Sequence, residues 1–141
     1  MKKTLFTGAA TAVITPMYAD GTVNYEAFDA ILEEQIAGGI DGIVVCGTTG
    51  ESATLTDEEH VEVIRRCVNT VNHRVPVIAG AGSNDTAYAV ALSKEAKAIG
   101  ADGLLHVTPY YNKTSQLGLV RHFNAIADAT DLPVILYDVP S

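Results

Sequence analysis

Threonine and tyrosine side chains stand where several apolar runs of this sequence end. The clearest case is Val44-Val45-Cys46-Gly47-Thr48-Thr49-Gly50-Glu51, in which strand-forming residues give way to a glycine-bracketed turn with two hydroxyls and a carboxylate. Other apolar runs end at Thr15, Thr108, Tyr110, Tyr111 and Tyr137. Such groups can pass protons along a chain and can hold a small carboxylate through neutral donors.

This candidate set contains no nucleophile. A hydroxyl needs a neighbouring base to become a good nucleophile, and no histidine lies among these residues. We therefore predict a proton relay that serves a nucleophile supplied from elsewhere. The alternative for Thr48 and Thr49 is an ordinary polar turn whose hydroxyls bond the local backbone.

The histidines and cysteines do not form a metal or redox motif. Cys46 and Cys67 are interpreted as buried free thiols, because their spacing fits neither a metal site nor a redox pair. The four histidines fall on predicted helices or within a predicted strand and are interpreted as structural or solvent-facing: His60, His73, His106 and His122. We expect no metal and no cofactor.

Short apolar runs alternate along the chain with segments of helical periodicity. The predicted strands are 8–14, 43–46, 75–79, 104–107 and 133–137. Helices are predicted to start at Asn24, at the capping box Thr56-Asp57-Glu58-Glu59, at Asn84 or Asp85, and in a segment with Leu117, Val120, Phe123 and Ile126 facing inward. Near-continuous apolar strands that alternate with helices indicate a parallel sheet covered by helices.

An internal sequence repeat supports a regular succession of strand–helix units. Gly39-Ile40-Asp41-Gly42 and Gly100-Ala101-Asp102-Gly103 share a Gly-x-Asp-Gly pattern two units apart. A closed (βα)8 barrel needs roughly 200 residues or more, whereas this chain has 141. The predicted fold is therefore α/β, a parallel (βα) half of a TIM (β/α)8 barrel with four βα units plus a fifth strand, in a single domain over 1–141.

A doubly wound nucleotide-binding fold would require a glycine-rich fingerprint after the first strand. Thr15-Pro16-Met17 stands there instead, and Gly80-Ala81-Gly82 lacks a third glycine at the required spacing. We interpret the latter as a tight strand-to-helix turn.

Charge and hydropathy limit the partners and the compartment. The net charge of −8 argues against nucleic acid and anionic membranes as partners, because the chain has no basic patch to meet them. No apolar run follows Met1-Lys2-Lys3 that is long enough for a signal peptide or a membrane span. We expect a cytoplasmic protein.

Three segments resemble the dihydrodipicolinate synthase family of pyruvate-dependent class I aldolases, which also includes N-acetylneuraminate lyase. They are Gly47-Thr48-Thr49-Gly50-Glu51-Ser52, Val107-Thr108-Pro109-Tyr110-Tyr111-Asn112 and Leu136-Tyr137-Asp138-Val139-Pro140-Ser141. The pair Thr48-Thr49 favours the synthase, since the lyase branch has Ser-Thr there. The resemblance implies a (βα)8 barrel that joins pyruvate to aspartate semialdehyde in lysine and diaminopimelate biosynthesis.

The resemblance also implies residue roles. In the family a lysine forms a Schiff base with pyruvate, and the resulting enamine attacks the aldehyde. Thr48 and Tyr137 would be relay members beside that lysine, and Tyr137 the acid/base during Schiff-base formation. Tyr111 would be a third relay member, contributed by a neighbouring subunit with the Tyr110 ring at the dimer contact. Thr49 would hold the pyruvate carboxylate.

The sequence departs from the family pattern at the nucleophile. The Schiff-base lysine lies on the family's sixth strand, and an arginine that grips the second substrate follows Ser141. Neither position is present, so we expect the isolated chain to be inactive or weakly active. The lysines present are Lys2, Lys3, Lys94, Lys97 and Lys113, none of them in an apolar strand. Asp138 stands where the family has asparagine.

A further departure concerns feedback inhibition by lysine. Regulated bacterial members carry a histidine and a glutamate at the positions of Asp57 and Tyr88, although His60 and Asn84 match the family. We predict that the parent enzyme is not inhibited by lysine.

Alternatives to half of a synthase remain open. One is a related pyruvate aldolase such as N-acetylneuraminate lyase, and another is an aldolase-like enzyme whose homo-oligomer rebuilds a barrel. A third is a non-catalytic self-assembling half-barrel module. A five-stranded parallel sheet with two open edges and an apolar inner face predicts self-association in every case.

Overall fold

A single parallel sheet organises the chain. The computed structural model describes residues 4–139, so Lys2, Lys3, Pro140 and Ser141 lie outside it. Five strands pair in the order β1-β2-β3-β4-β5, and every neighbouring pair is parallel. The strands are β1 (Ala10–Ala12), β2 (Gly42–Val45), β3 (Val77–Gly80), β4 (Gly103–Val107) and β5 (Val134–Tyr137). The predicted half barrel is confirmed.

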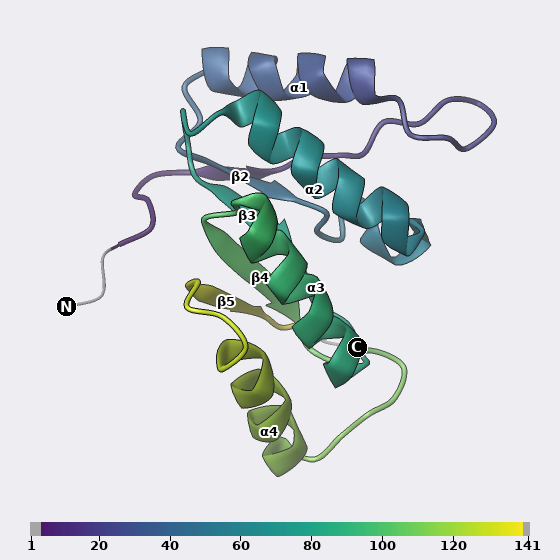
Figure 1. Cartoon of the computed structure of the whole chain (residues 1–141), viewed down its shortest axis with the longest axis vertical. Helices are drawn as coiled ribbons and strands as arrows, with labels where there is room; N and C mark the ends of the chain where they lie inside the picture. The colour runs from purple at the N-terminus through teal and green to yellow at the C-terminus, as the bar shows by residue number, and fades with distance from the viewer. Residues whose placement is uncertain (1–3, 140–141) are drawn as a thin grey trace.

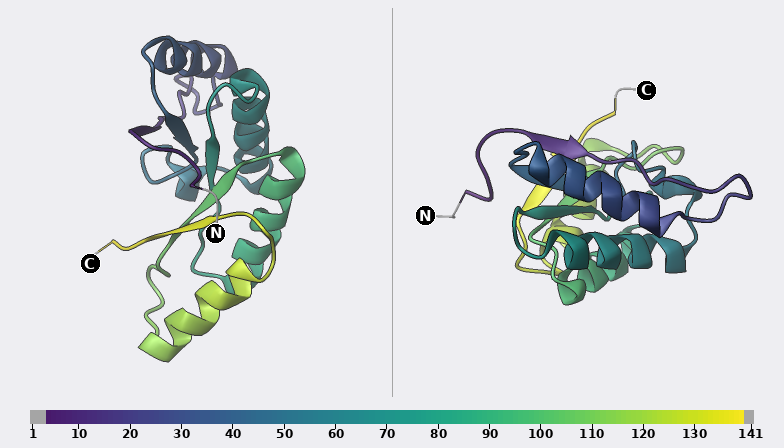
Figure 2. Two further views of the ribbon diagram at one scale, coloured as in Figure 1. Left: turned by 90° about the vertical axis from the view of Figure 1, so that its left-hand side faces the viewer. Right: turned by 90° about the horizontal axis from the view of Figure 1, so that it is seen from above.

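Four helices form a layer on one side of this sheet. They are α1 (Tyr25–Ala37), α2 (Asp57–Val71), α3 (Thr86–Ile99) and α4 (Gln116–Ala127), and a short 3-10 turn, η1 (Ser52–Thr54), precedes α2. Figures 1 and 2 show the helices gathered on one side, with the other side of the sheet uncovered. Strand side chains alternate accordingly, because Ile43 and Val45 are buried against the helices while Val44 is half-buried on the opposite face.

Helix starts follow the capping signals in the sequence. Thr56 Oγ1 accepts from Glu59 N (3.2 Å) and Glu59 Oε2 accepts from Thr56 N (2.9 Å), which completes the predicted capping box of α2. Asn24 caps α1, and Asp85 rather than Asn84 caps α3. The side-chain amide of Asn84 instead donates to Tyr110 O (3.1 Å).

The repeated Gly-x-Asp-Gly pattern has a physical explanation. Asp41 accepts from Ala9 N through its carboxylate (2.9 Å) and donates its own N–H to Ala9 O (3.0 Å). Asp102 makes the same two bonds to Val77, at 2.9 Å each. Gly100 ends α3 with φ +106°, which suits glycine. Each aspartate therefore clamps the start of its own strand to the segment that begins the preceding strand.

Several details of the predicted elements were wrong. The first strand is limited to Ala10–Ala12 instead of 8–14, and the third starts at Val77 instead of position 75. The second strand ends at Val45, because Cys46 turns into the left-handed region with φ +54°. On α4, Leu117 and Val120 are exposed (59% and 54%), and the buried side chains are His122 and Ile126.

The error on α4 lies in the choice of period. Leu119, His122, Phe123 and Ile126 are the more buried positions, and they follow the i, i+3, i+4, i+7 spacing of a helix face. The predicted positions are spaced by three residues throughout, so they move gradually around the helix and do not stay on one face.

The sheet has two unpaired edges within residues 4–139. β1 pairs only with β2, and β5 pairs only with β4. Ile135 and Leu136 of β5 and Val139 beyond it are exposed. None of the helices in the described part of the chain is long and apolar enough to cross a membrane.

Candidate active site

The carboxyl ends of β2 and β5 bring two predicted site residues together. Thr48 and Tyr137 line one small cavity of about 30 Å³, together with Gly47, Gly80 and Val107. Thr49 is exposed beside Thr48 in the same turn. The fourth predicted residue, Tyr111, is 97% exposed and lines neither this cavity nor the larger one described below.

The turn that carries the two threonines is held by backbone bonds. Gly50 N donates to Gly47 O (3.1 Å) and Glu51 N donates to Thr48 O (3.0 Å). Thr15, a candidate for chemistry by sequence, is buried and donates its hydroxyl to Gly50 O (2.8 Å). Thr15 therefore supports the turn from the end of the first strand.

Gly80 allows the closest backbone approach in the site. A Cβ added at Gly80 would lie 2.0 Å from the carbonyl oxygen of Cys46, the residue with φ +54°. Only glycine leaves room for that oxygen. The carbonyl of Gly80 in turn accepts from His60 Nε2 (2.8 Å), since a carbonyl oxygen can only accept. Burial lowers the pKa of His60. This bond fits the structural interpretation of His60, whose side chain also lines the larger cavity described next.

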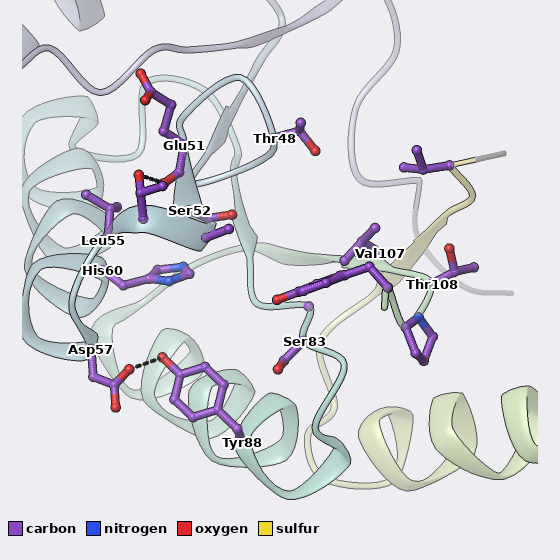
Figure 3. A pocket seen from close by; sticks show the side chains of 16 residues that line it. Thr48, Glu51, Ser52, Leu55, Asp57, His60, Ser83, Tyr88, Val107 and Thr108 are labelled. Atoms are coloured by element: carbon purple, nitrogen blue, oxygen red, sulfur yellow. Dashed lines mark hydrogen bonds between the residues drawn. The ribbon is translucent and has the colours of Figure 1, made fainter. Parts of the chain in front are cut away.

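A second, larger cavity of about 510 Å³ lies next to the threonine turn (Figure 3). Side chains from β2–α2, β3–α3 and β4–α4 segments line it, including Ser52, Asp57, His60, Tyr88 and Tyr110. Tyr88 donates its hydroxyl to Asp57 Oδ1 (2.8 Å), as the dashed line in Figure 3 marks. Burial is the main cause, and this bond the second, that raises the pKa of Tyr88 to about 12. The phenol therefore stays protonated and continues to donate to Asp57.

Two further histidines are buried between the sheet and the helices. Ser93 Oγ donates to Ala89 O (2.5 Å), so it accepts from His106 Nε2 at 3.2 Å. This fixes His106 as the Nε2–H tautomer and leaves Nδ1 buried without a partner among residues 4–139. His122 Nδ1 lies 2.8 Å from Thr86 Oγ1, and its Nε2 also has no partner. Both are structural, as predicted, while His73 is exposed.

No lysine within residues 4–139 lines either cavity. Lys94 and Lys113 are exposed, and Lys97 pairs with Asp131 at 2.6 Å. Among the same residues no three histidine, cysteine, aspartate or glutamate side chains lie together as they would around a metal ion.

Comparisons with known proteins agree on one family. Residues 5–141 match the model of the dihydrodipicolinate synthetase family. A 4-hydroxy-tetrahydrodipicolinate synthase from Acetivibrio thermocellus is 57% identical over 140 residues, which are 99% of this chain and 48% of that protein.

Solved structures give the same picture. The chloride-inhibited dihydrodipicolinate synthase from Acinetobacter baumannii complexed with pyruvate superposes with a TM-score of 0.94 at 48% identity, over 97% of this chain and 47% of that one. DHDPS from Cyanidioschyzon merolae with lysine bound has a TM-score of 0.94 at 44% identity, over 98% and 47%. The chain spans about half the length of the relatives it matches.

Proposed function

Because this chain belongs to the dihydrodipicolinate synthetase family, we propose that it carries part of the active site of a carbon–oxygen lyase of the 4-hydroxy-tetrahydrodipicolinate synthase type. The substrates would be pyruvate and aspartate semialdehyde, in lysine and diaminopimelate biosynthesis. The observation that supports this proposal most is the meeting of Thr48 and Tyr137 on one cavity at the carboxyl ends of parallel strands.

The proposed reaction divides the work between an amine and these hydroxyls. A lysine amine attacks the ketone carbon of pyruvate, water leaves, and loss of a methyl proton gives an enamine that attacks the aldehyde carbon. Tyr137 would donate and accept the protons of the first step, with Thr48 linking it to Tyr111 of a neighbouring subunit. Thr49 would bind the pyruvate carboxylate.

The amine must come from outside the described residues. No lysine of residues 4–139 lines the cavities, and Lys113 is exposed in the loop after β4. A buried or desolvated lysine would be needed, because water keeps an exposed lysine protonated near neutral pH. We infer that the amine is supplied by a segment outside the residues that the structure describes.

The open sheet suggests how such a segment would bind. Ile135, Leu136 and Val139 are exposed beside an unpaired strand edge, and the face opposite the helices is uncovered. Unpaired edges and apolar faces associate with further strands. We propose that the chain forms homo-oligomers when alone and pairs with a complementary (βα) segment when one is present.

Borohydride trapping tests the proposal. The chain is incubated with pyruvate and borohydride, alone and mixed with the part of the Acetivibrio thermocellus relative that it does not match, and intact masses are measured beside light scattering. We expect association, no adduct on this chain, and an adduct on the complementary segment. Tyr137→Phe should slow trapping by about 100-fold, because a positioned acid/base contributes at least that much.

Tyr18→Phe is the matched control, since Tyr18 is exposed and lines neither cavity, and it should trap at the wild-type rate. An adduct on a lysine of this chain alone would identify a self-sufficient aldolase. A folded mixture without any adduct would favour the non-catalytic module.

A separate prediction concerns lysine as a ligand. In the 510 Å³ cavity the side chains of Asp57 and Tyr88 bond to each other. The family resemblance implies a histidine and a glutamate at these two positions in regulated members. Calorimetric titration of the chain and of the reconstituted enzyme with lysine should therefore show no binding at micromolar concentrations. Micromolar binding would contradict this, and Tyr88→Glu is the variant expected to gain affinity.

A further inference from the structure

The loop after β4 holds Tyr111 in an unusual conformation. Its φ is +68°, in the left-handed region that disfavours a bulky side chain. Asn112 N donates to Tyr110 O (2.9 Å), which closes a three-residue turn with Tyr111 at its centre. A turn of this hand is rare and strained. Because the ring of Tyr111 is 97% exposed, packing of that ring within this chain cannot hold the conformation.

Two asparagines tie the turn to the loop before α3. Asn84, in the loop before α3, donates its side-chain amide to Tyr110 O (3.1 Å). Asn112 donates its side-chain amide to Asn84 O (3.1 Å). The carbonyl of Tyr110 thus accepts from both asparagines, and each loop receives one side-chain bond from the other.

We propose that Asn84 and Asn112 are positioning residues that present the Tyr111 phenol outward, to a second polypeptide. The Asn84 amide fixes the Tyr110 carbonyl toward the loop before α3, and the Asn112 amide ties the residue after Tyr111 to Asn84 O. Tyr111, between these two fixed points, must reverse direction and point its side chain away. The neighbouring Tyr110 then faces the 510 Å³ cavity of its own chain. A role of this phenol in a proton relay rests on the proposed function. The two side-chain bonds of Asn84 and Asn112, called the asparagine clamp below, do not depend on it.

Proteolysis of the intact chain tests the clamp without any activity. Chymotrypsin cleaves after tyrosine only when the segment opens, so cleavage after Tyr111 follows the population of the open loop. Asn84→Asp and Asn112→Asp keep the side-chain shape but replace the donor with an oxygen that repels the carbonyl. Each should raise cleavage after Tyr111, relative to cleavage after Tyr18, by about tenfold.

Asn69→Asp is the matched control, because Asn69 is exposed on α2 away from this loop, and its ratio should stay at the wild-type value. The internal reference at Tyr18 corrects for general destabilisation, which would raise both cleavages. Unchanged ratios in both loop variants would overturn the proposal.

The reconstituted enzyme supplies the second measurement. Asn112→Asp should lower kcat by about 10- to 100-fold with little change in KM for pyruvate, since it misplaces a group that acts in the chemical step. In a Tyr111→Phe background the same substitution should have little further effect. Additive losses would contradict a role through Tyr111. An inactive reconstitution would count against the proposed function, while the cleavage ratios would still decide on the clamp.

Discussion

Replacing Gly80 with alanine is expected to lower the free energy of unfolding by about 3 kcal/mol. The added Cβ would lie 2.0 Å from the carbonyl oxygen of Cys46 and 2.5 Å from its carbonyl carbon. These are backbone atoms, so no side chain can rotate away to make room. Either β3 or the segment entering the threonine turn must shift, and the bond from His60 to the Gly80 carbonyl is strained with it.

Gly47→Ala is the matched control for this substitution. Gly47 lies in the neighbouring turn, but a Cβ there would meet Val44 and Leu105 at ordinary distances of 3.7 and 3.8 Å. Its stability should stay within about 1 kcal/mol of wild type. Urea unfolding of the three proteins measures the difference. Equal stability of the two variants would show that Cys46 can relax away from β3.

Lowering the pH from 6.5 to 4 is expected to reduce the free energy of unfolding by about 3 kcal/mol through protonation of His106 alone. Burial, with His122 as a smaller cause, lowers the pKa of His106 from 6.5 to about 4. Between these two pKa values the unfolded chain therefore binds one more proton at this position than the folded chain does. The stability is fully present above pH 6.5 and is lost as the pH falls toward 4.

Geometry gives the physical reason for this penalty. His106 is fully buried, its Nε2–H is bound to Ser93, and its Nδ1 has no partner in the described part of the chain. Protonation would place a new N–H and a positive charge on that unpartnered nitrogen. Burial lowers the pKa of His122 as well, which adds to the loss in the same direction.

Urea unfolding from pH 7.5 to pH 4 measures the effect. His106→Leu keeps a side chain of similar size without a titrating group, so its acid loss should be smaller than that of wild type by about 3 kcal/mol. His73→Gln, at an exposed position, should lose as much as wild type. An unchanged acid response in His106→Leu would exclude His106 as the cause. Carboxylates such as Asp29 and Asp131, whose pKa values are lowered by Arg66 and Lys97, act mainly below this range.

Local signals were sufficient for the order of elements. The capping box at Thr56, the Asn24 cap and the apolar runs each depend on residues close in sequence, and the structure confirms them. The meeting of Thr48 with Tyr137 also followed from sequence, because parallel strands bring their carboxyl ends to one edge.

Contacts with distant backbone atoms could not be predicted in the same way. The left-handed turn at Cys46 depends on the missing Cβ of Gly80, and the role of Thr15 depends on the carbonyl of Gly50. Asn84 looked like a helix cap, yet its side chain binds the carbonyl of Tyr110. In each case the partner is a backbone carbonyl oxygen. Every residue has one, so no sequence motif shows which carbonyl will be the partner.

The paired bonds of Asp41 and Asp102 mark two equivalent segments of the chain before β5. The first runs through β1, α1, β2 and α2 and contains the clamp from Asp41 to Ala9; the second runs through β3, α3, β4 and α4 and contains the clamp from Asp102 to Val77. Recombination between Val71 and Val77 would cut neither clamp. The same sequence repeat that marks the fold is thus consistent with descent from a duplicated quarter-barrel gene, and it gives a junction at which related chains can be exchanged.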